Sequence, residues 1–294
     1  MSKVQTLVQL LLQDRGGIAA AAMQNFSRSS LSHLLSDRAY VSLYYRSIFK
    51  RSPDLANPKT FNEKLQWLKL YARDPKQNVL VDKAAVKGYI ADTLGAEYVI
   101  PTLGVWERYE DIDFDALPKR FVLKCTHDSG SVVLCRDKDS FDFDAAAKKL
   151  KNGLSHNLYW HGREWVYKDV KPRILAEAYM TDSAASDELR DYKFFCFDGK
   201  VKCFKVDFDR FVGHRANYYA PDCSLLPFGE VVCPPDFDRR LELPASLPSM
   251  IRLAERLSAG YPFLRVDFYD VGGRIYFGEL TFFPASGFGP FVPD

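Results

Sequence analysis

The chain has 294 residues, of which 47% are hydrophobic and 27% charged, and its net charge is +2. A chain of this length predicts about two domains with a full hydrophobic core. The balanced charge excludes the strongly basic surface that nucleic acids attract, so we expect no nucleic-acid partner. The six cysteines form no C-x-x-C pair, which argues against a disulfide framework or a zinc motif. We expect them to be reduced thiols of a cytoplasmic protein.

The first 51 residues differ in charge from the rest of the chain. Seven basic and two acidic residues give them a net charge of +5. We expect helices that pack on the next domain and turn a basic face to solvent. Weak contact with an anionic membrane surface, or with a polyanionic substrate, is the alternative. The apolar run Leu7–Leu12 is too short for a membrane span, and Gln13-Asp14-Arg15 interrupts it before any signal-peptide pattern.

Local patterns predict the elements in chain order. Residues 1–75 are predicted to be helical, and Thr60 stands three residues before Glu63, the capping-box spacing of a helix start. A further helix is predicted from Asp82 until Gly95 ends it. After these come predicted strands at 121–125, 131–135, 174–180, 191–197 and 200–207, and helices at 143–154 and 248–258.

Two tight turns predict antiparallel hairpins. Asp198-Gly199 joins two strand patterns, and Gly272-Gly273 joins Phe263–Asp270 to Arg274–Thr281. Helices and hairpins are mixed along the chain, without a regular alternation of strand and helix. The predicted fold class is therefore α+β.

The last hairpin carries a candidate metal site. Asp267 lies on its first strand and Glu279 on its second, beside the loop 283–287. Carboxylates on adjacent strands supply the hard oxygen ligands that a divalent cation prefers. Surface hairpins also carry carboxylates without binding a metal, which is the alternative.

The loop between the strands at 121–125 and 131–135 has the parts of a phosphate-holding flap. Lys124 supplies a strand-anchored charge, and Ser129-Gly130-Ser131 lets backbone N–H groups approach phosphate oxygens. The sequence is not a Walker A motif, and an ordinary turn is the alternative. His127 either donates to a phosphate or acceptor or is simply solvated.

More candidates follow downstream. Glu177 ends an apolar strand pattern and is predicted to lie at the edge of an adenine; the alternative is an ordinary edge-strand Glu. Lys193 and Lys205 lie on the two strands of one hairpin, and Arg215-x-Asn217 follows it. We expect these cations to aim at one face and to neutralise a triphosphate and a transferring phosphoryl group.

The order of these parts resembles the ATP-grasp superfamily from Asp82-Lys83 to the C-terminus. The closest resemblance is to its TupA-like branch, known from loci for teichuronopeptide and other polysaccharides. Three strings carry it: N-P-K-T-F-N-E-K-L-Q-W at Asn57–Trp67, K-C-T-H-D-S-G from Lys124, and G-E-L-T-F-F-P-A-S-G-F-G from Gly278.

The resemblance implies an ATP-grasp fold, two α+β lobes that grip ATP, with a helical N-terminal extension. The predicted domains are residues 1–78 for the helical region, 79–175 for the N-terminal lobe with the flap, and 176–294 for the C-terminal lobe with the nucleotide and metal site. ATP and Mg²⁺ are the cofactors that the resemblance implies.

The resemblance also implies roles. Lys83 and Lys124 would contact the ATP phosphates under the flap of Ser129, Gly130 and Ser131, with Glu177 at the adenine or ribose and Lys193 and Lys205 facing the phosphates. Arg215 and Asn217 would hold the transferring phosphoryl group or the acceptor carboxylate, and Asp267 and Glu279 would carry Mg²⁺. Thr281 stands where most ATP-grasp enzymes have an Asn, so the number of Mg²⁺ ions stays open.

The function implied is an ATP-dependent carboxylate-amine ligase of cell-surface polysaccharide biosynthesis. Its partners would be ATP, a glycan or uronic-acid acceptor and an amine or amino acid. The alternatives are a kinase for a glycan hydroxyl, with Asp207 or Asp209 as base, a glycosyltransferase of the same pathway, and a silent ATP-binding module. We expect a cytoplasmic location, with the inner face of the membrane as a contact for the basic N-terminal region.

Overall fold

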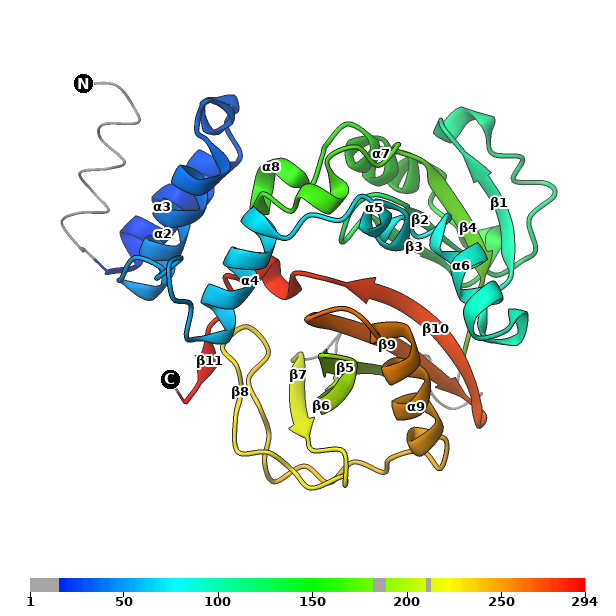
Figure 1. Ribbon diagram of the computed structural model, residues 1–294. Helices are drawn as coiled ribbons and strands as arrows, with labels where there is room; N and C mark the ends of the chain where they lie inside the picture. The colour runs from blue at the N-terminus through cyan, green and yellow to red at the C-terminus, as the bar shows by residue number, and fades with distance from the viewer. Residues whose placement is uncertain (1–15, 182–188, 210–212, 294) are drawn as a thin grey trace.

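The structure, a computed structural model, describes residues 16–181, 189–209 and 213–293 (Figure 1). Its α-helices are α2 (Gly16–Ser27), α3 (Asp37–Phe49), α4 (Phe61–Tyr71), α5 (Lys76–Val81), α6 (Val86–Thr93), α7 (Phe143–Leu154), α8 (Tyr159–Gly162) and α9 (Leu247–Ser258). Its 3₁₀ helices are η1 (Ser30–Leu34), η2 (Ala96–Tyr98), η3 (Tyr109–Asp111), η4 (Lys138–Ser140), η5 (Trp165–Tyr167) and η6 (Pro284–Gly287).

The strands of the described residues form three antiparallel sheets. The first has the order β1-β4-β2-β3, the second β10-β9-β5-β6-β7, and the third β11-β8. The strands are β1 (Thr102–Trp106), β2 (Phe121–Cys125), β3 (Val132–Cys135), β4 (Ile174–Ala178), β5 (Asp191–Phe197), β6 (Lys200–Phe208), β7 (Arg215–Tyr219), β8 (Gly229–Glu230), β9 (Phe263–Val271), β10 (Arg274–Thr281) and β11 (Phe291–Val292). This mixture of helices and antiparallel sheets confirms the predicted α+β class.

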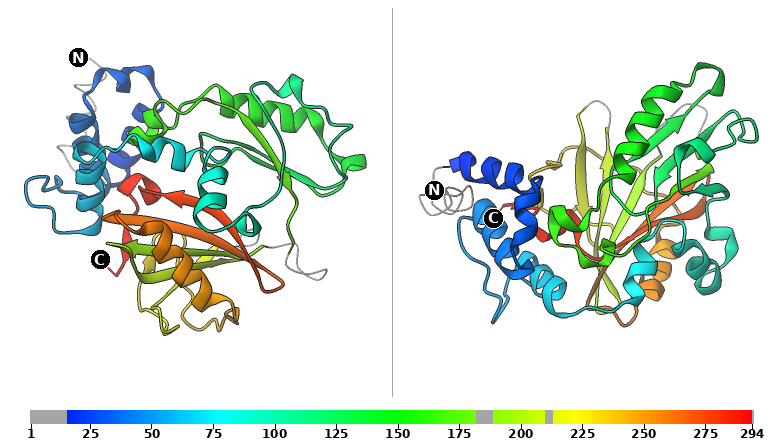
Figure 2. Two further views of the ribbon diagram at one scale, coloured as in Figure 1. Left: turned by 45° about the vertical axis from the view of Figure 1, so that its right-hand side comes forward. Right: turned by 90° about the horizontal axis from the view of Figure 1, so that it is seen from above.

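In Figure 1 the four-stranded sheet and α7 form an upper lobe, and the five-stranded sheet and α9 form a lower lobe. Figure 2 shows from two further sides that α2 and α3 lie at one end of the molecule, beside α4 and α8. Within the described residues, no helix is both long and apolar enough to cross a membrane. The run Leu7–Leu12 lies outside those residues.

Both predicted hairpins are confirmed, and their turns explain them. Asp198 and Gly199 have φ angles of 49° and 70°, and Gly272 and Gly273 have 59° and 84°. A two-residue turn with two positive φ angles matches the twist of the strands that it joins. Asp and Gly tolerate those angles better than other residues, so the turn sequences set the strand ends.

Helix starts follow their capping residues. Thr60 accepts a hydrogen bond from the Glu63 N–H, and the Glu63 carboxylate accepts one from the Thr60 N–H, which is the predicted capping box. The helix predicted from Asp82 begins only at Val86. The reason is that the Asp82 carboxylate accepts hydrogen bonds from the N–H groups of residues 84 and 85 and forms a turn there.

Three hydrophobic clusters hold the fold together. One lies between α2 and α3, a second lies within the upper lobe, and the largest joins α4, α5 and α6 to the lower sheet. The predicted boundary between residues 175 and 176 is wrong, because it cuts β4, which pairs with both β1 and β2. The upper sheet therefore extends at least to Ala178.

Candidate functional site

A row of charged side chains crosses one face of the lower sheet. Glu279 on β10 lies opposite Asp267 on β9, Asp267 lies opposite Lys193 on β5, and Lys193 lies opposite Lys205 on β6. Directly opposed residues of antiparallel strands share a face and bring their Cβ atoms close together. The sheet register therefore gathers two predicted metal ligands and two predicted phosphate contacts in one line.

A β-bulge in β10 determines that Glu279 lies opposite Asp267. The register between β10 and β9 shifts between Phe277 and Glu279, which leaves Gly278 without a directly opposed partner. A Cβ atom on Gly278 would meet the Asp267 carbonyl oxygen at 3.1 Å. Glycine at this position therefore allows the close approach that puts Glu279 opposite Asp267.

The opposite face of the sheet is apolar. Phe194, Phe204 and Val266 are fully buried on it, and α9 packs against it through side chains such as Ala254 and Leu257. Strand residues alternate between the two faces. The same strands therefore supply both the core and the charged row.

Arg265 joins the two acidic residues of the row. Its Nε and Nη2 atoms donate to the two Asp267 carboxylate oxygens at 2.7 and 2.6 Å, and Nη2 also donates to Glu279 at 2.7 Å. Burial raises the pKa of Asp267 to about 7 against the opposing effect of Arg265 and Lys193. The sequence analysis missed Arg265, although its place two residues before Asp267 puts it on the same face of β9.

The lysines of the row are held by carboxylates. Lys193 contacts Asp191 and lies 2.6 Å from Asp207, and Lys205 lies 3.0 Å from Glu230 and 3.5 Å from Asp207. Burial lowers the pKa of Lys193, but the neighbouring carboxylates outweigh it and raise the pKa overall. Lys193 is therefore held in its charged form, which is the form that binds phosphate.

A second set of charges lies in the upper lobe. Glu177 on β4 contacts Lys124 on β2, and Lys87 on α6 lies 2.5 Å from its other carboxylate oxygen. Burial raises the pKa of Glu177, but the two lysines outweigh it and lower the pKa overall. Glu177 thus fixes two lysines. Its predicted role at an adenine or ribose stays a prediction, and Lys87 is a further residue that the sequence analysis missed.

Lys83 lies between the two lobes. Its Nζ donates to the Asp128 carbonyl, and its backbone N–H donates to the Thr126 carbonyl at 3.0 Å. Burial lowers the pKa of Lys83, and the charges of Glu279 and Asp128 partly oppose that shift. The charge of Glu279 on β10 thus acts on Lys83, so the two side chains are close enough to interact electrostatically.

We call Lys83, Lys87, Lys124 and Glu177 the upper cluster. We call Asp191, Lys193, Lys205, Asp207, Arg265, Asp267 and Glu279 the lower cluster. The upper cluster holds three cations and one carboxylate, whereas the lower cluster holds three cations and four carboxylates.

The predicted flap is an exposed turn between β2 and β3. Ser129 and Gly130 are exposed, and Gly130 has a φ of +102°, which favours glycine. Ser131 donates to the Asp128 carboxylate, and the Val132 N–H donates to the Gly130 carbonyl at 2.9 Å. The backbone is thus shaped as a tight turn over Lys83, and its contact with phosphate stays a prediction.

His127 is not solvated. It is 1% exposed, and its Nε2 lies 3.1 Å from the His156 carbonyl oxygen. Its Nδ1 is buried and has no hydrogen-bond partner within the described residues. The solvated alternative is therefore wrong, and His127 joins the flap to the segment before α8.

Arg215 and Asn217 do not join the lower cluster. Tyr218 lies opposite Lys205, whereas Asn217 lies opposite Val206 and so shares the other face of the sheet. Asn217 exchanges two hydrogen bonds with the backbone of Asp236, and Arg215 is exposed and donates to the Pro235 carbonyl at 3.3 Å. The expectation that both aim at the same face as the lysines is wrong, because it ignored the alternation of side chains along β7.

The loop after β10 is tied to α4. Asn62, Gln66 and Lys69 lie on one stripe of α4 and donate to the carbonyl oxygens of Ser286, Gly287 and Gly289 at 2.7–3.1 Å. Ala285 and Ser286 have φ angles of 46° and 53°, a left-handed conformation that costs about 1–2 kcal/mol per non-glycine residue.

The α4 contacts thus hold a strained loop directly after β10, the strand that carries the predicted metal ligand Glu279. Residues 57–67 carry part of the family resemblance, and two of them, Asn62 and Gln66, form part of this attachment. Thr281, at the end of β10, donates to the Glu279 carboxylate at 3.4 Å. Thr281 was the third predicted metal ligand, and in this structure its hydroxyl is a hydrogen-bond partner of Glu279.

The donor set fits a hard divalent cation. Asp267 and Glu279 offer carboxylate oxygens from directly opposed positions, and the Glu279 side chain is 42% exposed, so it is open to a ligand. Arg265 supplies the positive charge between the two carboxylates in this structure. These residues would hold Mg²⁺, and an ion there would share them with Arg265.

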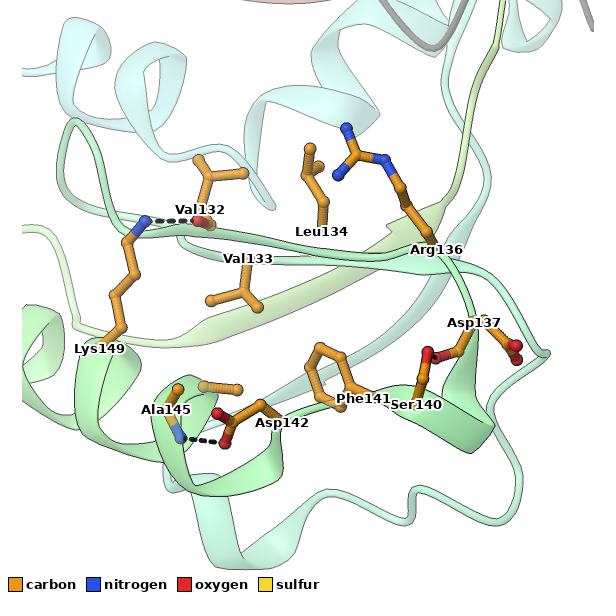
Figure 3. A pocket seen from close by; sticks show the side chains of 11 residues that line it. Val132, Val133, Leu134, Arg136, Asp137, Ser140, Phe141, Asp142, Ala145 and Lys149 are labelled. Carbon is orange, nitrogen blue, oxygen red and sulfur yellow. Dashed lines mark hydrogen bonds between the residues drawn. The ribbon is translucent and has the colours of Figure 1, made fainter. Parts of the chain in front are cut away.

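A hollow of about 430 Å³ lies away from both clusters, between β3 and α7 (Figure 3). Lys149 on α7 donates to the Val132 carbonyl at 2.8 Å at one end of it. None of the predicted site residues lines this hollow. We therefore assign the functional site to the two clusters and not to this hollow.

Comparisons with solved structures find several ATP-dependent ligases. D-alanine–D-alanine ligase from Bacillus anthracis is 20% identical, with 69% of this chain and 56% of that chain covered and a TM-score of 0.38. The ATP-grasp ligase PsnB with Mg and ADP is 12% identical, with 83% and 61% covered and a TM-score of 0.41. Phosphoribosylamine–glycine ligase from Thermotoga maritima is 12% identical, with 70% and 48% covered and a TM-score of 0.42.

This chain spans less than two thirds of the length of each of these three structures. No curated protein sequence matches it. Residues 63–294 match the TupA-like ATPgrasp family, a range that includes the upper cluster, the lower cluster and the flap. The chain therefore belongs to the TupA-like ATP-grasp family.

Proposed function

We propose that the chain is an ATP-dependent carboxylate-amine ligase of cell-surface polysaccharide biosynthesis. The observation that carries the proposal is the charged row Glu279–Asp267–Lys193–Lys205, with Arg265 between its two carboxylates. Such a row offers a metal site next to phosphate-binding cations. Phosphoryl transfer depends mainly on charges placed in this way and needs little covalent chemistry from the protein.

The reaction has two steps. A carboxylate oxygen of the acceptor attacks the γ-phosphorus of ATP, ADP leaves, and an acyl phosphate forms. The nitrogen of an amine then attacks the carbonyl carbon, phosphate leaves, and the nitrogen loses a proton to give an amide. Bound Mg²⁺ supplies charge neutralisation of the β- and γ-phosphates.

The residues of this chain position the reacting groups. Lys83 and Lys124 bind the ATP phosphates from above, and Lys193 and Lys205 bind them from below. The flap 129–131 closes over the phosphates and excludes water. Arg265 takes the role first expected of Arg215: its guanidinium binds the Asp267 and Glu279 carboxylates in this structure and would exchange those contacts for the acyl phosphate.

The proposed acceptor site is a pocket of about 700 Å³ beside the flap. Its lining comes from residues 27–33, from the flap and from residues 152–161. Trp160 stacks on His33 with ring centroids 3.6 Å apart, and Arg28 lines the same pocket. An aromatic face with a nearby guanidinium supports an acceptor that is a sugar with a carboxylate, such as a uronic acid in a glycan. The amine would be that of an amino acid.

The kinase alternative requires a general base for a sugar hydroxyl. Asp207 is paired with Lys193 and Lys205, and Asp209 lies 3.8 Å from Arg239. These contacts favour structural roles for both carboxylates and so support the ligase over the kinase.

We also propose that the reaction takes place in the cytoplasm, where ATP is available. The support for weak membrane contact is the net charge of +5 over residues 1–51. Lys3 and Arg15 of that region lie outside the described residues, and Arg51 pairs with Glu63. Co-sedimentation with anionic vesicles at low salt tests the contact; binding that survives deletion of residues 1–30 would assign it elsewhere.

Product analysis tests the ligase. The chain is incubated with ATP, Mg²⁺ and uronic acids, with and without amino acids, and ADP and amide are measured. Hydroxylamine should trap a hydroxamate of the activated carboxylate. A stable phosphosugar without amine and without hydroxamate would identify a kinase, a glycoside would identify a glycosyltransferase, and no product with intact ATP binding would leave a silent binding module.

A further inference from the structure

Three residues of mixed ligand chemistry converge at the edge of the lower sheet, outside the proposed Mg²⁺ site. Asp207 lies near the end of β6, His214 immediately precedes β7, and Cys233 lies in the segment after β8. One ligand atom from each of them lies within 4.8 Å of the other two. Asp207 and Cys233 are buried, whereas the His214 side chain is 38% exposed, so the cluster opens to solvent on one side.

The distances match those of a small tetrahedral site. His214 Nε2 lies 3.0 Å from Asp207 Oδ1 and 3.8 Å from Cys233 Sγ. Ligands of one tetrahedral zinc ion are separated by about 3.3 Å for an oxygen and nitrogen pair and about 3.6 Å for a nitrogen and sulfur pair. The third pair, Asp207 and Cys233, lies within 4.8 Å, against about 3.5 Å at one zinc ion, so shifts of about an ångström would bring all three atoms to one ion.

The arrangement is not that of an ordinary Cys–His hydrogen bond. Cys233 Sγ lies 3.5 Å from His214 Nδ1 and 3.8 Å from Nε2. A sulfur that hydrogen-bonds one ring nitrogen in the ring plane lies much farther from the other nitrogen. The near-equal distances put the sulfur over the ring face, so a side-chain rotation of His214 or Cys233 would bring it to an ion bound at Nε2 in the ring plane.

We propose that Asp207, His214 and Cys233 bind one zinc-class divalent cation, with a fourth position open to solvent. A thiolate, an imidazole and a carboxylate are the ligands that zinc and its neighbours prefer, whereas Mg²⁺ prefers oxygen ligands alone. The site is therefore chemically distinct from Asp267 and Glu279. The sequence analysis predicted no zinc motif, because separations of 7 and 19 residues match no short spacing pattern.

The neighbouring charges allow such an ion. Asp207 binds Lys193 through Oδ2 at 2.6 Å, and its Oδ1, which lies 3.0 Å from His214 Nε2 and 3.5 Å from Lys205, is the oxygen that faces the cluster. Lys205 keeps its partner Glu230 at 3.0 Å. The Asp207 carboxylate would thus bind the ion with one oxygen and Lys193 of the lower cluster with the other.

Binding requires the Cys233 thiol to release its proton to solvent. Burial raises the pKa of this thiol, so the ion must displace a tightly held proton. Affinity for the ion should accordingly fall as the pH is lowered, because protons compete with the ion for the Cys233 sulfur.

Cobalt tests the site on the full chain under reducing conditions. Co²⁺ is titrated in the presence of excess Mg²⁺, which occupies oxygen-only sites. One equivalent should produce the ultraviolet thiolate-to-cobalt charge-transfer band, which Asp267 and Glu279 are unable to generate, and Zn²⁺ should abolish it. Cys233→Ser should remove the band, and His214→Ala should weaken binding at least about tenfold.

Cys223→Ser is the matched control, because Cys223 is an exposed thiol elsewhere on the surface. It should leave the band and the affinity unchanged. His214 is partly exposed, so His214→Ala should fold even where Cys233→Ser does not. Absence of the band in the wild-type chain at saturating Co²⁺, or wild-type affinity in His214→Ala, would overturn the proposal.

Discussion

The upper and lower clusters both pair buried cations with carboxylates, but the balance between cations and carboxylates is opposite in the two. In the upper cluster a single carboxylate, Glu177, is shared by Lys87 and Lys124, and Lys83 lies nearby. In the lower cluster Asp267 and Glu279 share Arg265, and Lys193 is enclosed by two further carboxylates. The upper cluster therefore has an excess of cations, which suits phosphates, and the lower cluster has an excess of carboxylates, which suits a metal.

The carboxylates also explain how so many cations stay close together before ATP binds. Buried charges are costly unless they are paired, and breaking a buried pair by removing one partner costs about 3–5 kcal/mol. Glu177 and Asp267 pair the cations in the absence of a nucleotide. ATP phosphates would then compete with these carboxylates for the same lysines and for Arg265.

The largest predicted effect comes from the lower cluster. Asp267→Asn removes a predicted metal ligand and should lower the rate of ADP formation by about 10²–10³. Thermal unfolding without ligand should show a folded variant, and ATP with Mg²⁺ should stabilise it much less than the wild type. Asp92→Asn, an exposed carboxylate on α6, is the control and should behave as wild type. Equal stabilisation of wild type and Asp267→Asn would remove Asp267 from the metal site.

The second prediction addresses the upper cluster. Lys124→Met removes a predicted phosphate contact and should raise the KM for ATP by about 10–100-fold, since a hydrogen bond to a charged group contributes about 1.5–3 kcal/mol. It leaves Glu177 with Lys87 alone, so adding Glu177→Gln should recover stability but not the KM. Lys119→Met, an exposed lysine near the same strand, is the control. A fall in kcat with an unchanged KM would assign Lys124 to the chemical step. It would contradict the idea that the upper cluster binds phosphates and the lower cluster binds the metal.

The local sequence predicted most elements, and for identifiable reasons. The capping box at Thr60 and the turns at Asp198-Gly199 and Gly272-Gly273 act within a few residues, so their physical cause is visible in the sequence. Asp267 and Glu279 were found because one tight turn fixes their strands side by side.

The missed features depend on contacts between distant segments. Arg265 was overlooked because its importance comes from Glu279 on the next strand. The face of Asn217 depends on the register between β6 and β7, which no tight turn in the sequence sets. The boundary within β4 was wrong because the pairing of β4 with β1 spans about 70 residues. None of these contacts leaves a local pattern.

The third prediction tests whether α4 supports the lower cluster. Gln66→Leu removes the hydrogen bonds to the Ser286 and Gly287 carbonyl oxygens and should lower the free energy of unfolding by about 1–3 kcal/mol. The loop beside Glu279 should loosen, so affinity for Mg²⁺ should fall as well. Lys64→Leu on the exposed face of α4 is the control. Lower stability with unchanged Mg²⁺ affinity would limit α4 to a structural role.

The smallest predicted effect comes from a carboxylate outside both clusters. Burial raises the pKa of Glu63, but hydrogen bonds from Thr60, Arg51, Lys59 and Asp54 outweigh it and lower the pKa from 4.5 to about 2. A carboxylate whose pKa is lowered in the folded state stabilises the fold fully at pH values above its pKa in the unfolded chain. That contribution should be lost as the pH falls from about 4.5 to about 2.

Glu63→Gln should therefore destabilise the fold at pH 6 and flatten the decline of stability between pH 4.5 and pH 2. Urea unfolding of both proteins across that range measures the difference, and Glu97→Gln, an exposed carboxylate, serves as control. Because Glu63 belongs to neither cluster, ATP and Mg²⁺ affinity at neutral pH should stay unchanged. A parallel loss of nucleotide affinity would show that the α4 cap and the ATP site are coupled. The α4 cap would then contribute to nucleotide binding in addition to the upper and lower clusters.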